Sequence, residues 1–589
     1  TNKGLRVWRN IGNGWTDTSE RAVTSGLAAG RAFNAADLDN DGDTDLVLPS
    51  VSEVRIARND GGNSNQSLRV RLSGKVSNRS SVGAKIEARA GSLVQKLETS
   101  SVSPAITPAD VIFGLGKRRV ADAVRVLWPA GIVQAETAIA ATPRTRFATL
   151  DVIELDRKPS SCPYLYAWNG HRFEFITDFM GGGEMGHLEQ PGVFNKPDPD
   201  EYVRLRGDQL KARNGRYELR VTNELEEAIF ADHFRLIAVD HPHSVQVYPN
   251  EGLTDPPRPF KLYATRDAHP PLAAVDDHGN DVLPQISRMD REYPDDFQRD
   301  RIRGYAAEHS LTMKLAEKHS ANQRMLLLLT GWTDYAWSSD NLAASQAKKA
   351  MMLPALQVKD EVGNWRTVIQ DIGIPVGRPQ TVTVDLTGKF LSSSREVRIV
   401  TNMRILWDQI LVGTIDLRAP LMVPLDAVRA DLRWRGFSRE ITPDGREPFG
   451  YDYDQISFTS PWKVMPGLYT REGDVRELLL KSDDMFVISR PGDEISLSFD
   501  AALLPQLRSG WTRTFLLYAD GFSKEMDINS ASPDQVLPLP FHGMSKYPYP
   551  YPETYPMTAK RRAYMNKYNT RRVTAEVPSI DTLVADSQR

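Results

Sequence analysis

Apolar and polar residues alternate along most of the chain, in short stretches separated by turn residues. The alternation is regular at residues 68–72, 217–221 and 495–499. A period of two places one face of an extended strand inward, so these stretches predict antiparallel β structure. Gly (40) and Pro (38) occur throughout the chain and supply the turns. The pattern therefore predicts a mainly β fold with few helices.

Two stretches have longer apolar runs than simple alternation allows. Residues 325–332 and 513–521 each contain a run of large apolar side chains that ends near a glycine. Such runs are typical of strands that are buried on both faces. They predict β-sandwich-like domains in the C-terminal part of the chain.

Two segments have the pattern of helices. Residues 341–352 are rich in Ala and follow Asp340, a suitable N-cap, and residues 559–568 follow Thr558, a second N-cap residue. Between residues 547 and 556 Tyr and Pro alternate, which favours an extended arm over a packed element. We expect this arm to lie across the surface.

Composition excludes several classes of protein. Lys plus Arg total 73 against 76 Asp plus Glu, so the chain has no global basic field and we expect no nucleic-acid partner. Apolar runs reach about five residues, whereas a membrane-spanning helix needs about 20, so no transmembrane span is expected. The single cysteine, Cys162, excludes an internal disulfide and a cysteine zinc site. Because the chain starts at Thr1, we interpret it as processed or truncated.

One motif carries clear chemistry. Aspartates occupy alternate positions over nine residues, at Asp37, Asp39, Asp41, Asp43 and Asp45. Gly42 supplies a tight turn within them, and such a loop can direct several oxygens inward, as Ca²⁺ requires. We assign side-chain ligation to Asp37, Asp39, Asp41 and Asp45 and main-chain ligation to Asp43. The loop is not an EF-hand, because its twelfth position is Leu48 where an EF-hand has Glu.

The alternative interpretation of this motif is a solvated acidic turn. Five like charges in nine residues repel one another unless a cation neutralises them, which favours the calcium site. No His or Glu stands near the loop to act on a bound water, so we expect a structural ion and not a catalytic one.

The segments around the loop resemble a known repeat. The stretches GLRVWRN (4–10), GNGWTD (12–17), the aspartate loop and VRIARN (54–59) are similar to the VCBS/FG-GAP repeat, which builds β-propeller blades with a calcium loop. Its period here is 49 residues, from Arg9 to Arg58. A propeller needs at least about four blades, so the resemblance implies that the others come from upstream of Thr1 or from another chain.

The following segment resembles the ASPIC/UnbV domain. Five pieces match in the family's order, namely LRVRL (68–72), SNR (77–79), VGAKI (82–86), FGLG (113–116) and VRVLWPAG (124–131). The resemblance implies an exported module, located outside the cell, on its surface or in the periplasm. It names no catalytic residues.

Clusters of turn residues divide the chain into five parts. Residues 59–64 and 157–163 separate the first two segments from the remainder, and weaker boundaries fall near residues 300 and 535. The predicted domains are an incomplete propeller blade (1–62), the ASPIC/UnbV domain (63–157), a β-rich domain (158–300), a β-sandwich-like domain (301–535) and a Pro/Tyr-rich arm with a short helix (536–589).

Weaker constellations have alternative interpretations. Gly181, Gly182 and Gly183 follow a predicted strand, but no Lys-Ser/Thr follows them, so a turn is favoured over a phosphate loop.

His233 and His241 could ligate a transition metal. Their eight-residue separation places them about 26 Å apart on an extended strand, which argues against one shared ion.

Aromatic residues stand beside carboxylates at residues 407–408 and 451–454. Sugar rings stack on aromatic faces and carboxylates accept hydroxyl protons, so a glycan-binding cleft is one interpretation. The other is that these aromatics are core residues.

Two hypotheses of function follow. The first is an exported calcium-binding protein of several β domains that acts in adhesion, scaffolding or assembly with a protein partner or cell-surface component; the arm and its basic helix (Lys560, Arg561, Arg562, Lys567) could contact that partner. The second is a carbohydrate-binding protein or carbohydrate-active enzyme with its site in residues 160–535. No catalytic set is recognisable in the sequence, which favours the first.

Overall fold

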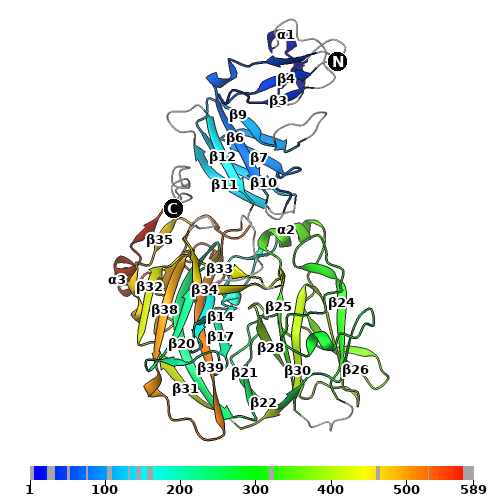
Figure 1. Cartoon of the computed structure of the whole chain (residues 1–589), viewed down its shortest axis with the longest axis vertical. Coiled ribbons are helices and arrows are strands. Elements are labelled where there is room, and N and C mark those ends of the chain that lie inside the picture. The colour runs from blue at the N-terminus through cyan, green and yellow to red at the C-terminus, as the bar shows by residue number, and fades with distance from the viewer. Residues whose placement is uncertain are drawn as a thin grey trace. The chain divides into compact units, whose positions relative to one another are not determined.

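A computed structural model of the chain has strands as its main secondary structure, with few helices, which confirms the predicted mainly β fold (Figure 1). Two units are formed, by residues 1–157 and 158–589. Cys162 and the first two residues of the repeat motif, Gly4 and Leu5, lie outside the described residues. The structure describes residues 6–12, 14–22, 33–49, 53–74, 77–101, 109–129, 133–140, 147–154, 163–316, 324–418, 420–442, 444–458, 465–527 and 529–574.

The N-terminal unit starts with small antiparallel sheets. Strand β1 (Trp8–Asn10) pairs with β2 (Trp15–Asp17), and a short helix α1 (Ser19–Ala22) follows. A second sheet has the order β3-β4-β5 (Asn34–Ala36, Asp45–Pro49, Val54–Ala57). A 3-10 turn, η1 (Gly62–Ser64), then leads into the next sheets. The assignment of these strands to a propeller blade stays a prediction.

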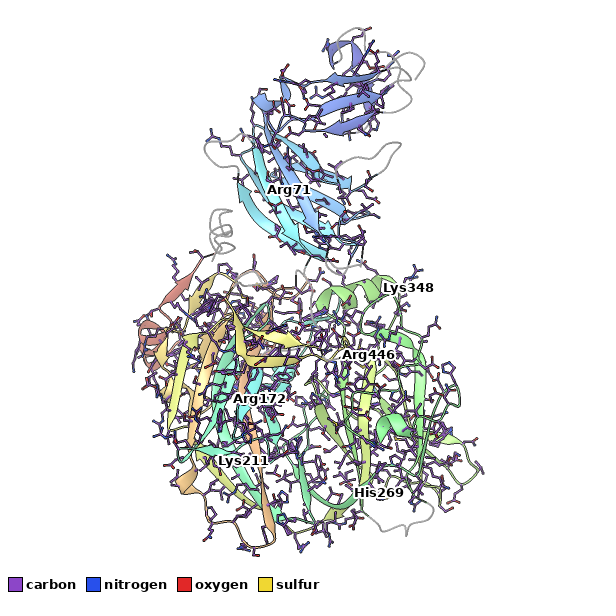
Figure 2. All side chains as sticks on the ribbon, in the orientation of Figure 1. Arg71, Arg172, Lys211, His269, Lys348 and Arg446 are labelled. Carbon is purple, nitrogen blue, oxygen red and sulfur yellow. The ribbon has the colours of Figure 1, made fainter. Side chains whose placement is uncertain are left out.

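The second half of this unit packs two sheets around one core. The buried side chains include Leu68, Val70, Phe113 and Trp128, and Leu68 and Val70 confirm the inward face predicted for residues 68–72. Arg71 lies on the exposed side of the same strand and pairs with Asp151 at 2.8 Å (Figure 2). The sheet orders are β12-β6-β9 (Phe147–Ile153, Gln66–Ser73, Val111–Gly116) and β11-β10-β7-β8 (Val133–Ala140, Val120–Leu127, Lys85–Ala90, Leu93–Glu98).

The C-terminal unit contains a first sandwich that is built from two segments of the chain. One sheet has the order β33-β34-β14-β13-β19-β38-β32-β36, with β18 added at β19, and the other has the order β17-β39-β20-β31, with β37 added at β20. Both sheets contribute to one buried apolar cluster. The bounds of the first sheet are Phe437–Ile441, Gly450–Ser457, Phe173–Asp178, Tyr164–Trp168, Arg216–Thr222, Asp493–Asp500, Arg429–Trp434, Gly473–Asp474 and, for β18, Ala212–Arg213. Those of the second are Asp200–Leu205, Trp511–Glu525, Glu227–Pro242, Leu421–Asp426 and, for β37, Val487–Ser489.

A second sandwich is inserted between β20 and β31. Its sheets have the orders β21-β22-β30-β25-β28 and β23-β24-β29-β26-β27, and side chains from both fill one core. The first sandwich is therefore built from strands on both sides of the insertion. The domain boundaries predicted at residues 300 and 535 describe each domain as one continuous stretch of chain. In the order given, the strands of the first sheet are Gln246–Pro249, Leu262–His269, Ile405–Asp416, Met325–Thr333 and Gln380–Asp385. Those of the second sheet are Ala273–Asp276, Tyr305–Lys314, Glu396–Met403, Ala355–Lys359 and Trp365–Ile369.

The two long apolar stretches are central strands. β25 (Met325–Thr333) lies between β28 and β30, and β39 (Trp511–Glu525) lies between β17 and β20. Leu326, Leu327, Leu328 and Leu329 are all buried, so both faces of β25 are covered as predicted. The remaining short elements are β15 (Leu188–Gln190), β16 (Val193–Phe194), β35 (Gly467–Tyr469), β40 (Arg571–Val573), η2 (Gly181–Gly183), η3 (Pro284–Ile286), η4 (Arg476–Leu479) and η5 (Ala501–Leu503).

The two predicted helices exist, but one has different limits. α3 (Ala559–Tyr568) has the predicted bounds, and the Thr558 hydroxyl accepts a hydrogen bond from the Arg561 N–H. α2 (Ser338–Gln346) starts three residues before the predicted position, because Asp340 lies inside its first turn and accepts a hydrogen bond from the Trp337 N–H at 3.0 Å. In the described part of the chain, no helix has the length and apolar character to cross a membrane.

The Pro/Tyr-rich arm is packed more deeply than predicted. Tyr547 is fully buried in a cluster with Phe230, Phe486 and Met185, so the arm is part of the core and does not merely lie on the surface. Helix α3 is also tied down: Lys560 is 3.2 Å from Asp483, and Lys567 is 2.7 Å from Glu477. These basic side chains hold the arm to its own unit.

Candidate functional site

The aspartate loop connects β3 to β4 and brings carboxylates together. Asp37, Asp39 and Asp41 each place one carboxylate oxygen within 4.8 Å of the other two. The alternate spacing of the sequence thus converges in space for the first three residues of the motif. Oxygen ligands at this density suit a hard divalent cation such as Ca²⁺.

The other two aspartates take different positions. Both carboxylate oxygens of Asp45 accept backbone hydrogen bonds, from Leu38 N–H at 2.9 Å and from Asn59 N–H at 2.8 Å. Asp45 therefore ties the start of the loop to Asn59, just after β5, and its assignment as a side-chain ligand stays a prediction. The Asp43 side chain is buried, and its backbone N–H donates to Asp41 at 3.1 Å.

Two arginines offset part of the negative charge. The Arg69 guanidinium contacts the Asp37 carboxylate and donates to the Asn40 side chain at 2.7 Å, while Arg58 lies 3.2 Å from Asp39. The five aspartates of the loop outnumber these two arginines, so negative charge remains in excess. The donor set and the charge both fit a divalent cation, which Asp37, Asp39 and Asp41 would hold.

The loop rests on the sheet that follows it in the chain. Gly42 has a φ of +93°, and a β-carbon added there would lie 2.6 Å from the Phe147 side chain on β12. The Ser67 hydroxyl on β6 donates a hydrogen bond to the Gly42 carbonyl. Glycine is therefore required at this position both by the turn and by the close approach.

The histidines considered as metal ligands do not form a site. His233 and His241 both lie on β20, as the sequence predicted, and are separated along it. His241 contacts Thr514 at 2.9 Å, and burial lowers its pKa. His233 packs edge-on against Tyr518 with 5.2 Å between ring centroids. Both belong to the interior of the sandwich.

The aromatic residues beside carboxylates are mainly core residues. Tyr451 packs 4.4 Å from Tyr164 between ring centroids, and the Tyr453 hydroxyl donates to Glu494 at 2.7 Å. Asp408 is buried and accepts the backbone N–H groups of Asp290 and Arg291 at 3.1 and 2.9 Å. Its role is to fix a loop, which the sequence alone could not distinguish from ligand binding.

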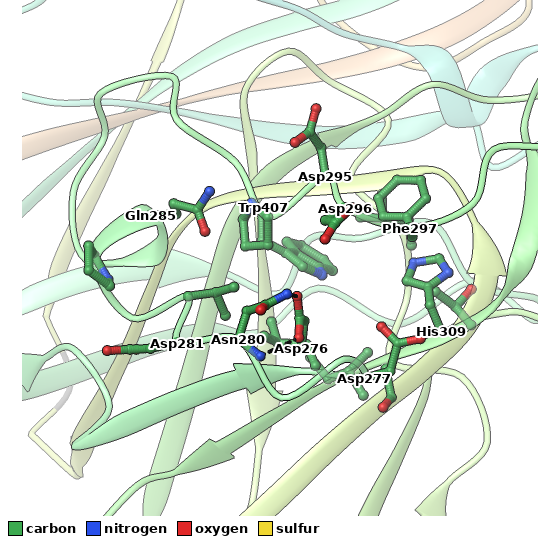
Figure 3. A pocket seen from close by; sticks show the side chains of 18 residues that line it. Asp276, Asp277, Asn280, Asp281, Gln285, Asp295, Asp296, Phe297, His309 and Trp407 are labelled. Atoms are coloured by element: carbon green, nitrogen blue, oxygen red, sulfur yellow. Dashed lines mark hydrogen bonds between the residues drawn. The ribbon is translucent and has the colours of Figure 1, made fainter.

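Trp407, however, lines a cavity of about 470 Å³ in the inserted sandwich. Figure 3 shows the ring among carboxylates, with Asp295 and Asp296 on one side and Asp276 on the other. The volume lies in the usual range of small-molecule sites, about 300–1,000 Å³. Apolar side chains also line it: Val282, Leu311, Ile399 and Ile405.

The polar lining of this cavity combines carboxylates with side-chain amides, hydroxyls and the His309 ring. Although burial opposes the charged form, hydrogen bonds from Asn280 and His278 lower the pKa of Asp276. Burial lowers the pKa of His309, whose ring stacks on Phe297 at 4.3 Å between centroids. The cavity can accept protons from hydroxyl or ammonium groups of a small ligand.

Sequence analysis missed two titratable clusters in the C-terminal unit. His542 lies 2.7 Å from both Asp484 and Asp520, which joins the arm to the sandwich. Glu184, His187 and Glu525 form the other, with ligand atoms within 4.8 Å of one another. The spacing of Glu184 and His187, directly after the glycine turn, is the local sequence signal that could have indicated this second cluster.

The fold is that of a multi-domain protein of β-sandwiches with an acidic loop near its start. A family model described as ASPIC and UnbV matches residues 74–151. The chain therefore contains an ASPIC/UnbV domain, within the segment where the sequence predicted one. No curated protein matches the chain.

Proposed function

We propose that the chain is an exported calcium-binding protein that acts in adhesion, scaffolding or assembly with a protein partner or cell-surface component. The observation that carries the proposal is the convergence of Asp37, Asp39 and Asp41. A bound Ca²⁺ would offset the excess negative charge and make the loop rigid. The proposal places the first 62 residues in a VCBS/FG-GAP blade and the protein outside the cell, on its surface or in the periplasm.

Exposed apolar side chains among the first 62 residues support a protein partner. Trp8 and Trp15 lie on the same face of the β1-β2 hairpin and are 55% and 66% exposed. Val54 and Ile56 share one face of β5 and are 66% and 63% exposed. Large apolar side chains gathered in this way mark surfaces that a partner or a further domain covers.

Calcium should stabilise the N-terminal unit, and Asp39→Ala should abolish that effect. At a free Ca²⁺ concentration about 100 times the dissociation constant, binding adds about 2.7 kcal/mol, which corresponds to a rise of about 5–10 °C in the melting temperature. Differential scanning calorimetry in calcium and in chelator measures the shift.

The matched control is Asp60→Ala, which removes an exposed aspartate next to the loop that also pairs with Arg58. It should keep the calcium-dependent shift. Identical melting curves of the parent protein in calcium and in chelator would contradict the proposal.

The cavity at Trp407 supports a second candidate, a carbohydrate-binding or carbohydrate-active protein. Its carboxylates could accept hydroxyl protons, but Trp407 is only 5% exposed, so the half-buried Phe297 is the better ring for a sugar to contact. A glycan array combined with a hydrolysis screen tests it. Asp296→Asn should reduce binding of any glycan found at least about tenfold, because a lost charged hydrogen bond costs about 1.5–3 kcal/mol.

Asp454→Asn is the control, since Asp454 is also exposed but lies on β34 of the other sandwich. This candidate function would be excluded if no glycan is bound or hydrolysed, or if Asp296→Asn and Asp454→Asn weaken glycan binding equally.

A further inference from the structure

A cluster of ionisable side chains is buried near the end of β39. Glu184 and His187 lie in the segment that follows the η2 turn, and Glu525 is the last residue of β39. The segment is held against β39, since the Met185 N–H donates to the Ser523 carbonyl at 2.9 Å. Residues distant in the sequence thus meet at one place.

The three side chains are close enough to share one ion. The His187 Nδ1 atom is 3.2 Å from a Glu184 oxygen and 3.8 Å from a Glu525 oxygen. The opposite ring nitrogen, Nε2, lies 3.1 Å from the Asn341 side-chain amide. A metal at Nδ1 would leave a proton on Nε2, and the Asn341 amide, which donates to the Leu188 carbonyl at 2.9 Å, would have to give up that bond to turn its oxygen toward this proton.

Glu525 is the most deeply buried member, with a side chain 2% exposed. Its Oε1 atom, the oxygen 3.8 Å from His187 Nδ1, also accepts hydrogen bonds from Ser338, at 3.0 Å, and from Ser530. Its other oxygen, Oε2, is buried and receives no hydrogen bond from any described residue. A buried carboxylate oxygen without a donor costs free energy, and a cation beside it would recover that cost.

Further negative charge surrounds this carboxylate. Glu227 on β20 stands directly opposite Glu525 in the strand register and is also buried. Asp527, two residues further along, is fully buried and accepts hydrogen bonds from Ser339 at 2.6 Å and from Asn529 at 2.8 Å. Adjacent like charges are destabilising in a sheet, and more so in its interior.

Burial and neighbouring charges shift the pKa values of two members of the cluster. Burial, and then the Glu184 carboxylate, raise the pKa of Glu525. Although burial of the ring acts in the opposite direction, Glu184 and Glu525 raise the pKa of His187 well above its ordinary value.

We propose that Glu184, His187 and Glu525 bind a divalent first-row transition-metal ion in the C-terminal unit. A ligand set of one imidazole nitrogen and carboxylate oxygens suits zinc and the neighbouring first-row transition metals. The all-oxygen ligand set of the calcium loop suits them less well. The Glu184 and His187 side chains are each 16% exposed, which gives an ion a route in from that side. The ion would fasten the segment after η2 to the end of β39.

Zinc is the probe, because sites with nitrogen and oxygen ligands bind the divalent ions late in the first transition series with high affinity. Isothermal titration of ZnCl₂ into the chelator-treated full chain should show a tight site. Glu525→Gln should weaken that site at least about 100-fold, because loss of even an outer partner of a metal ligand costs about 10–100-fold. Glu525→Gln should not lower the melting temperature without zinc, because the amide keeps an oxygen for the serine hydroxyls and removes a buried charge.

A spectroscopic readout separates metal ligation from a structural role. Co²⁺ added to the parent protein should produce d–d absorption bands that His187→Gln removes. His278→Gln is the matched control, because His278 belongs to an exposed trio with Asp276 and Asp296 that could also hold an ion. It should leave both the bands and the tight zinc site in place.

The proposal is overturned if the chelator-treated parent binds no zinc after prolonged incubation at 50 µM, roughly a thousandfold above the dissociation constant at the weak end for structural zinc sites. It is equally overturned if Glu525→Gln and His187→Gln leave the tight site and the cobalt bands unchanged, or if His278→Gln removes them instead. None of these outcomes depends on the calcium loop, which belongs to the other unit.

Discussion

Arg435→Met should destabilise the C-terminal unit by about 3–5 kcal/mol, because it leaves buried carboxylates without their cation. The Arg435 side chain is 2% exposed and lies 3.5 Å from Glu224 and 3.3 Å from Glu494. Glu494 keeps Arg433 at 3.0 Å, and Glu224 keeps hydrogen bonds from the Ser438 and Thr222 hydroxyls at 2.7 and 2.9 Å. Urea unfolding, followed by tryptophan fluorescence, measures the loss.

Arg429→Met is the matched control for this prediction. Arg429 starts the strand that ends just before Arg435, and it also pairs with a carboxylate, Asp431, but its side chain is 69% exposed. Exposed ion pairs contribute at most about 1 kcal/mol, so this variant should unfold close to the parent midpoint. Equal losses in the two variants would show that the burial of Arg435 does not decide its contribution.

The sequence predicted those parts of the fold that depend on local pattern. The alternation at residues 68–72 identified a strand and its inward face, and the apolar run in β25 identified a strand covered on both sides. Thr558 and the residues after it defined α3. In each case the residues that determine the element are neighbours in the chain, so that periodicity and capping suffice.

The order of the strands could not be predicted, because it depends on pairing between distant segments. β20 pairs with β39 along most of its length, although almost 270 residues of the chain separate them. The insertion of one sandwich into another follows from this pairing. Composition shows where strands and turns occur but contains no signal for which strands become neighbours.

The candidate sites divide in the same way. The aspartate loop is a local motif, and three of its five carboxylates converge. The cavity at Trp407 needs a loop near residue 280, β24 and β30 together, and the cluster at Glu525 needs two segments more than 300 residues apart. Asp408 illustrates the limit of local inference, because its neighbour Trp407 lines the cavity while Asp408 itself fixes a loop.

Tyr547→Ala should destabilise the C-terminal unit by about 3–5 kcal/mol, although Tyr547 lies in a stretch whose composition resembles an extended arm. Its ring is fully buried, its hydroxyl donates to the Pro538 carbonyl at 2.9 Å, and the Lys524 ammonium lies 5.3 Å from its centroid. The substitution leaves a cavity among rigid neighbours. Equilibrium unfolding in urea measures the loss.

Tyr551→Ala provides a control within the same Tyr-Pro pattern, four residues further along, where the ring is 96% exposed. A surface substitution of this kind changes stability by no more than about 0.5 kcal/mol. Limited proteolysis should follow the same order, with the arm after residue 535 cut faster in Tyr547→Ala than in the parent protein or in Tyr551→Ala. If both alanine variants unfold at the parent midpoint, the arm does not contribute to the core, and its Tyr-Pro composition would describe it correctly after all.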